Sequence, residues 1–149
     1  MNERESLLLA VCDNPDDDTP RLVFADWLQE HGEEERAEFI RVQIELARGA
    51  VKSDLQEREK ALLAAHGESW SEPLRTLGLE LVNYQKPKPR SINGIEYRRG
   101  FPFGVQINEE KAEFADRAPA LFQCAPIQRI SFYHQWGRAS KVSVFSLLK

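Results

Sequence analysis

The segment that decides the fold is Thr19–Gly32, TPRLVFADWLQEHG, because it carries start and stop signals for one helix around an apolar face. Thr19 places a side-chain oxygen where the free amides of a first helical turn need an acceptor, and Pro20 follows where its missing N–H is harmless. Gly32 can adopt the left-handed conformation that ends a helix. Trp27 lies on the apolar face, so we interpret it as a core residue. The segment predicts a helical scaffold and indicates no reaction.

The size and composition of the chain indicate one domain with at most a short appended element. The 149 residues are 42% hydrophobic and 30% charged, which is typical of an ordered globular protein. No apolar run approaches the roughly 20 residues that span a bilayer, and the acidic start MNERESLLLAV fails as a secretory signal. We therefore predict a cytoplasmic location and no membrane partner. Cys12 and Cys124 belong to no metal or redox motif, and we interpret them as reduced, buried thiols.

Charge divides the chain into two unlike parts. Residues 1–70 contain 17 acidic and 8 basic residues, whereas residues 71–149 contain 7 acidic and 12 basic residues. The composition changes at residues 84–94, YQKPKPRSING, where Pro87 and Pro89 disfavour both a helix and a central strand. We therefore predict a helical domain over residues 1–83, a linker or exposed loop over residues 84–94, and a small α/β unit over residues 95–149.

Apolar spacing predicts four helices and a fifth helical piece in the acidic part of the chain. The expected ranges are residues 2–13, 20–31, 34–48 and 53–66. A short helical piece is expected around Trp70, Leu74 and Leu77. We interpret Gly67 as the residue that stops the fourth helix. Together these elements predict an N-terminal bundle of four to five helices.

The basic part of the chain alternates apolar and polar side chains. Residues 95–99 and 105–107 alternate on either side of a predicted Gly100–Gly104 turn, which indicates a β-hairpin. Asn108 and the acids after it indicate a helix start, and Pro119 favours a kink in that helix. Residues 127–132 alternate again and predict a further strand. The predicted fold class is therefore α+β, with a helical bundle followed by a small β-hairpin/helix/strand unit.

Two strings in the acidic part carry a family resemblance, DDDTPRLVFADWLQEHG at residues 16–32 and RAEFIRVQIELAR at residues 36–48. On these strings, residues 2–48 resemble the planctomycete repeat-companion domain, the N-terminal domain of bacterial proteins that often continue into leucine-rich repeats. Residues 98–101 and 120–130 are similar to the junction where such proteins enter their repeats. The resemblance implies no enzymatic activity, and it implies that residues 95–149 resemble the start of a leucine-rich repeat. Because a self-supporting solenoid needs roughly three repeats, the resemblance implies that this chain is a stand-alone member of the family or a fragment.

Residue types that carry catalysis or bind metals occur without the spacing that such sites need. Asp16–Asp18 lacks the ligand spacing of a calcium loop, and we interpret it as a solvated turn that favours the N-terminus of the next helix. The three histidines show no zinc spacing, and we expect His31 and His66 to hydrogen-bond the last carbonyls of two helices. No nucleophile elbow, P-loop or dinucleotide-binding motif occurs. We therefore expect no enzyme, no cofactor and no metal.

A cluster of aromatic and basic residues near the C-terminus is the first candidate contact surface. In the stretch FYHQWGR its residues are Phe132, Tyr133, His134, Trp136 and Arg138. Aromatic and arginine side chains dominate the energy of many protein interfaces. We therefore predict a non-catalytic protein-protein interaction or scaffold module that binds another protein through this cluster and an exposed strand edge near Ile130. A cap over the hydrophobic edge of the last strand explains the cluster equally well.

A basic segment is the second candidate surface, and it favours the alternative function of an accessory nucleic-acid-binding subunit. Its residues are Lys86, Lys88, Arg90, Arg98 and Arg99. These cations can hold phosphates, and a neighbouring tyrosine can stack on a base. The chain is acidic overall, however, with a sequence pI near 5.5, and it shows no recognised nucleic-acid motif. A contact between the basic part and the acidic helical part explains the same charges without a ligand, and we favour it.

Overall fold

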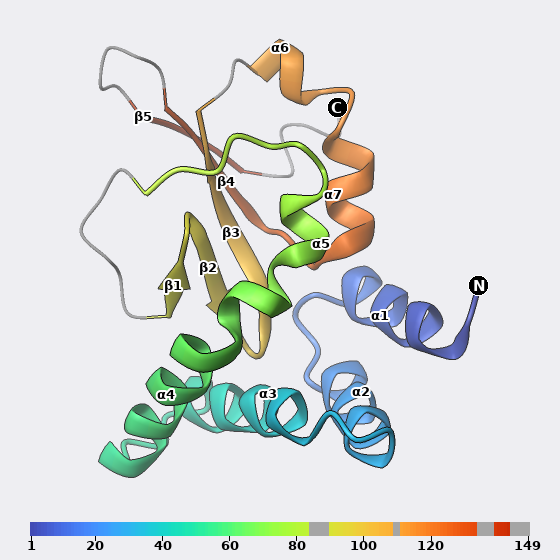
Figure 1. Cartoon of the computed structure of the whole chain (residues 1–149), viewed down its shortest axis with the longest axis vertical. Helices are drawn as coiled ribbons and strands as arrows, with labels where there is room; N and C mark the ends of the chain where they lie inside the picture. Colours follow the sequence, from blue (N-terminus) through green and yellow to red (C-terminus); the bar gives the residue numbers. More distant parts are fainter. Residues whose placement is uncertain (84–89, 109–110, 134–138, 144–149) are drawn as a thin grey trace.

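The computed structural model describes residues 1–83, 90–108, 111–133 and 139–143, and it has an α+β fold (Figure 1). Five helices come first in the described chain: α1 (Glu3–Asp13), α2 (Thr19–Glu30), α3 (Glu34–Ala47), α4 (Ser53–Trp70) and α5 (Glu72–Arg75). The strands are β1 (Ser91–Ile92), β2 (Ile95–Arg98), β3 (Phe101–Ile107), β4 (Arg129–Tyr133) and β5 (Ala139–Ser143). Two short helices, α6 (Lys111–Phe114) and α7 (Ala118–Cys124), stand between β3 and β4. The predicted fold class is confirmed.

The strands form one mixed sheet in the order β1-β2-β3-β4-β5. The pair β2 and β3 is the predicted antiparallel hairpin, and β4 pairs with β3 in parallel. A parallel pair needs a crossover, which α6 and α7 supply. The strand β5 then returns antiparallel to β4. Figure 1 shows α1 to α4 gathered at the end of the sheet where the hairpin turns, and α7 beside the sheet.

The start of α2 differs from the sequence prediction, whereas its end agrees. Thr19 is already helical and does not cap the helix, because Asp18 occupies the N-cap position. The carboxylate of Asp17 accepts the Thr19 N–H at 2.8 Å, so the acceptor for this free amide comes from two residues upstream. Gly32 has φ +81°, the left-handed conformation predicted for the residue after the helix.

The predicted stop of the fourth helix is wrong. Gly67 lies inside α4, which continues to Trp70. A Cβ on Gly67 would lie 2.9 Å from Cδ1 of Leu63 and 3.2 Å from Cδ1 of Ile92. The glycine therefore allows α4 to approach β1 closely, and its role is packing rather than helix termination.

The hairpin turn is shorter than predicted. Arg99 and Gly100 make the turn with φ values of +48° and +84°, as in a two-residue hairpin loop, and the residues from Phe101 to Gly104 belong to β3. Pro119 starts α7 and does not kink a continuous helix. Residues 84–89 of the predicted linker lie outside the described residues, and two other residues of that range form β1.

Two clusters of buried residues form the core. The larger cluster lies between the sheet and the helices α3, α4, α5 and α7, and the smaller one joins α1, α2 and α3 to Phe101 of β3. Arg36 of α3 lies between them, with its guanidinium 4.7 Å from the ring centroid of Trp70 and 5.3 Å from that of Phe101. Residues of the predicted helical domain, such as Leu62, therefore share a core cluster with sheet residues such as Ile130.

Candidate functional site

The predicted aromatic contact cluster is not an exposed surface where the structure describes it. Phe132 is fully buried and packs edge-on against Phe114, and Tyr133 is also buried. Both residues belong to β4, which pairs with β3 on one side and β5 on the other, so the exposed strand edge predicted near Ile130 is wrong. The other members of the cluster, His134, Trp136 and Arg138, lie outside the described residues.

Two described arginines of the basic segment, Arg90 and Arg99, contact the helical part of the chain. Nε of Arg90 lies 2.7 Å from the Glu59 carboxylate on α4. Arg99 donates to the carbonyl of Asp16 at 2.8 Å and lies 3.5 Å from the Asp18 carboxylate. These pairs are the contact between basic and acidic parts that the charge pattern suggested. Lys86 and Lys88 lie outside the described residues, and Arg98 is exposed.

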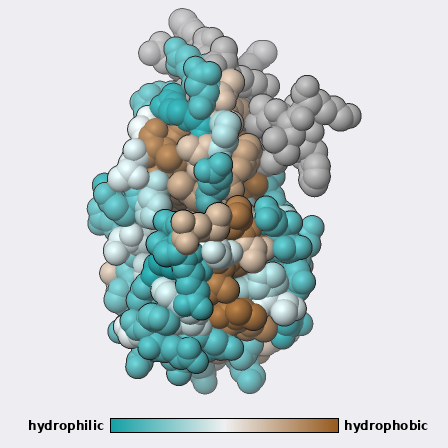
Figure 2. Space-filling model, turned by 90° about the vertical axis from the view of Figure 1, so that its right-hand side faces the viewer, coloured by the Kyte–Doolittle hydropathy of each residue, from teal (hydrophilic) through white to brown (hydrophobic). Residues whose placement is uncertain are grey.

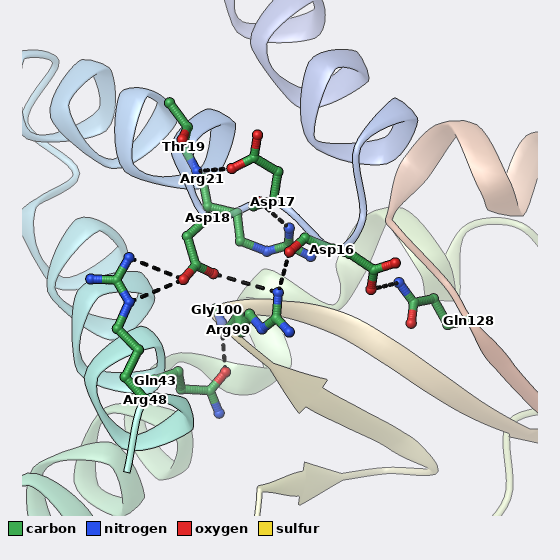
Figure 3. Close-up of polar contacts among 10 residues, drawn as sticks. All are labelled: Asp16, Asp17, Asp18, Thr19, Arg21, Gln43, Arg48, Arg99, Gly100 and Gln128. Atoms are coloured by element: carbon green, nitrogen blue, oxygen red, sulfur yellow. Dashed lines mark hydrogen bonds and ion pairs between the residues drawn. The ribbon is translucent and has the colours of Figure 1, made fainter. Parts of the chain in front are cut away.

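The acidic loop Asp16–Asp18 joins three elements (Figure 3). Asp18 pairs with Arg48 at the end of α3 and with Arg99 of the hairpin turn. The carboxylate of Asp16 accepts from the Gln128 amide, just before β4, at 3.4 Å. Hydrogen bonding to Thr19 lowers the pKa of Asp17, so this carboxylate favours the start of α2, as predicted. The loop is therefore a joint between helices and sheet, which the interpretation as a solvated turn missed.

A buried hydrogen-bond network fixes the hairpin turn on α3. The Gln43 side chain accepts the Gly100 N–H at 2.6 Å and donates to the Glu59 carboxylate at 2.8 Å. Gln43 is 3% exposed and Glu59 is 6% exposed. Because buried polar groups need partners, this network specifies where the turn lies. Arg98 and Arg99 take their positions from it, since Arg99 belongs to the turn and Arg98 directly precedes it.

A small cavity lies between the acidic loop Asp16–Asp18 and the hairpin turn, and we name it the junction cavity. It has a volume of about 10 Å³, room for one water-sized group. Its lining is Pro15, Asp16, Arg21, Arg98, Arg99, Pro102, Phe103, Pro126 and Gln128. The lining thus combines three prolines and one phenylalanine with three arginines and the polar residues Asp16 and Gln128.

Arg21 is the buried cation of the junction cavity. Its residue is 3% exposed, and one Nη donates to the Asp17 carbonyl at 2.8 Å. Its Nε is buried and has no hydrogen-bond partner among the described residues. Burial, followed by repulsion from Arg99, lowers the pKa of Arg21. In Figure 3 the guanidinium groups of Arg21 and Arg99 lie close to each other around the backbone of Asp16.

Arg98, Phe103 and Arg129 form a stack across three strands beside the cavity, and we name it the hairpin-end patch. The guanidinium carbons of Arg98 and Arg129 lie 5.1 and 5.3 Å from the centroid of the Phe103 ring. Arg129 also pairs with Glu96 on β2. It reaches across β3 over Gly104, where a Cβ would lie 3.2 Å from the Arg129 Nε.

Sequence reasoning selected only Arg98 from the hairpin-end patch. Phe103 and Arg129 are 26 residues apart, and only the parallel pairing of β3 with β4 brings them together. The available signal was the FPFG string directly after the hairpin turn, which places an aromatic residue beside the two arginines of that turn.

The conspicuous polar residues of α2 do not converge on a pocket. The indole N–H of Trp27 donates to Glu3 at 2.9 Å, and Asp26 pairs with Arg41 at 2.7 Å. Nδ1 of His31 lies 2.7 Å from the Trp27 carbonyl, the helix-end contact predicted for it. No group of three or more potential metal ligands occurs within the described ranges.

Two other candidate contact surfaces are an open groove and an area of exposed apolar residues (Figure 2). An open groove of about 730 Å³ runs between α4 and β1, and the pair Arg90–Glu59 lies in its lining. Figure 2 shows apolar residues reaching the surface on the side of the molecule where α1 and α7 lie. Two large apolar residues exposed on the helices α1 and α2 are Leu9 and Val23, which are 36% and 48% exposed. Neither surface gathers charged and aromatic groups as the hairpin-end patch does.

Comparisons with known proteins add no relative. No family model, curated protein or solved structure matches the chain. The resemblance to the repeat-companion domain therefore stays a prediction. Within the part of the chain that the structure describes, no helix combines the length and the apolar character needed to cross a bilayer.

Proposed function

We propose that this chain is a non-catalytic module that binds another protein through the hairpin-end patch. The observation that carries the proposal is the stack of Arg98, Phe103 and Arg129 on the surface, with guanidinium groups 5.1 and 5.3 Å from the ring centroid. Arginine and aromatic side chains are the residues that most often dominate interface energies. From the sequence, the same reasoning predicted a contact surface in the FYHQWGR stretch. Because Phe132 and Tyr133 are buried, the contacts of Phe103 with Arg98 and Arg129 favour the hairpin-end patch instead.

The surroundings of the patch support this role. Arg129 is held by Glu96, and Phe103 is half-buried between strands, so binding immobilises few additional side-chain torsions. Arg98 is exposed, and no carboxylate pairs with it among the described residues. A partner can therefore satisfy this cation without breaking a contact of the fold.

The alternative of an accessory nucleic-acid-binding subunit receives less support. Arg90 and Arg99 are engaged with carboxylates of the helical part, and the acidic loop Asp16–Asp18 borders the hairpin end. An extended polyanion meets repulsion there. The cytoplasmic location expected from the sequence, like this alternative, stays a prediction.

Site-specific photo-cross-linking tests the proposal. A photoreactive amino acid replaces Asp16, an exposed residue beside Arg98 and Phe103, in the full chain, and a control chain carries it at Glu45, an exposed position on α3. In lysate of the source organism we expect a discrete protein adduct from position 16 that is absent from position 45. The adduct should disappear when Phe103→Ser is added. No protein adduct at position 16, or one that nuclease treatment removes, would refute the proposal.

A further inference from the structure

Arg21, which lines the junction cavity, is a buried cation with few hydrogen-bond acceptors. The residue is 3% exposed, one Nη donates to the Asp17 carbonyl, and the Nε has no partner among the described residues. An unmet donor on a buried charged group is more unfavourable than one on a neutral group. The guanidinium group therefore favours a further acceptor at the cavity.

The cavity also gathers positive charge at one point. Arg98, Arg99 and Arg21 all contribute to its lining. Arg99 is paired with Asp18, whereas no carboxylate of the described residues pairs with Arg98, whose guanidinium lies against the Phe103 ring. Repulsion between Arg99 and Arg21 contributes to the lowered pKa of Arg21, which is consistent with cations that lack a full complement of anions.

We propose that the junction cavity binds a single carboxylate of a partner peptide, with the guanidinium groups of Arg21 and Arg98 as donors. This inference rests on the proposed protein-binding function and specifies the partner's chemistry. One carboxylate oxygen fits the volume of about 10 Å³, and the second oxygen stays at the rim beside Arg98.

The rim of the cavity favours a peptide over a polyphosphate. Pro15 and Phe103 are partly exposed and present apolar surface to the residues that flank the carboxylate. Asp16 also lines the cavity, and its carboxylate repels further negative charge. An acidic residue with apolar neighbours meets both conditions, whereas a chain of phosphates meets neither.

Nuclear magnetic resonance of the 15N-labelled full chain tests the inference through the Nε–Hε signal of Arg21. The probes are acetate, the neutral analogue acetamide and inorganic phosphate, all at constant ionic strength. We expect a saturable shift of the Arg21 signal with acetate and none with acetamide. N-acetylglutamate amide and N-acetylglycine then distinguish a side-chain carboxylate from a chain-terminal one, and saturable binding of either supports the proposal.

Two variants with exposed substitutions give the matched comparison. Arg98→Gln removes one charged donor, and we expect acetate affinity to fall by about 10-fold. Arg75→Gln removes an exposed arginine on α5, which pairs with Glu68, and should leave the affinity unchanged. No saturable shift, equal binding in Arg98→Gln, or tighter binding of phosphate than of acetate overturns the proposal.

The two proposals fail separately. If position 16 cross-links a partner while acetate leaves the Arg21 signal unchanged, the carboxylate site is refuted and the protein-binding function stands. If acetate binds but no protein adduct forms at position 16, the carboxylate site stands and the function is refuted.

Discussion

Replacing Gly100 by alanine tests the contact that positions the hairpin turn. Gly100 has φ +84°, and its N–H donates to the buried Gln43 side chain. A Cβ built on Gly100 lies 2.5 Å from Cγ1 and 2.6 Å from Cα of Ile40. The Cα of Ile40 belongs to the backbone of α3, so a change of rotamer cannot relieve the overlap. The turn has to move away from the helix.

The expected loss of stability follows from two terms. The left-handed conformation is unfavourable by roughly 1–2 kcal/mol for a residue with a Cβ. Moving the turn also breaks the hydrogen bond to Gln43 and leaves buried polar groups without partners, which is unfavourable by about 1–3 kcal/mol. We therefore expect Gly100→Ala to lower the free energy of unfolding by about 2–5 kcal/mol, a large loss for a domain of this size.

Gly49 supplies the matched control, since it has φ +93° but nothing within 4 Å of an added Cβ. Gly49→Ala should therefore show the conformational term alone, about 1–2 kcal/mol. Urea unfolding followed by circular dichroism measures both variants against the unmodified chain. Equal losses for Gly49→Ala and Gly100→Ala would refute the reasoning, because the close approach to α3 would then contribute nothing.

Two further predictions concern buried groups. Arg36 lies among aromatic rings with Nη1 unpartnered, so Arg36→Met, which keeps the volume, should change stability by less than about 1.5 kcal/mol. Arg36→Ala should lower the free energy of unfolding by about 3 kcal/mol or more. A larger loss for Arg36→Met than for Arg36→Ala in urea unfolding would contradict this prediction. Burial, Asp13 and Cys124 raise the pKa of the Cys12 thiol from 9.0 to about 11. Iodoacetamide should therefore modify Cys12 about 100-fold more slowly in the folded than in the unfolded chain at pH 8. The free energy of unfolding should also fall as the pH rises from 9 to about 11, because the unfolded chain binds fewer protons than the folded chain in this range. Equal modification rates would contradict the second prediction.

The elements of the fold were predictable because their signals are local. Helix spacing and the alternation of residues 95–99 gave the α+β class and the hairpin correctly. Glycines were harder to interpret, since Gly32 needs a positive φ whereas Gly67 makes room for Leu63 and Ile92. Both look the same in sequence. The difference depends on which distant residue packs there, and no local pattern carries that information.

The candidate site was less predictable because it depends on strand order and on one buried cation. Phe132 and an exposed interface residue have the same sequence signature, and Phe132 is a core residue because the face of β4 that carries it packs against Phe114 of α6. Arg21 lies in a helical pattern where an arginine is ordinarily exposed. Its burial follows from the approach of the hairpin turn to the acidic loop, and those two segments lie about 80 residues apart, as in the pair Arg99–Asp16.

The stability of the fold and the geometry of the site depend on the same contacts. The Gly100–Gln43 hydrogen bond fixes the turn, and the turn positions Arg98 and Arg99 beside Arg21. A substitution such as Gly100→Ala should therefore weaken carboxylate binding together with the fold, and it cannot separate the two. Arg98→Gln can, because Arg98 is exposed and its guanidinium lies against the Phe103 ring. If Arg98→Gln left the unfolding free energy unchanged and still lowered the acetate affinity by about 10-fold, the cation would serve recognition and not the fold.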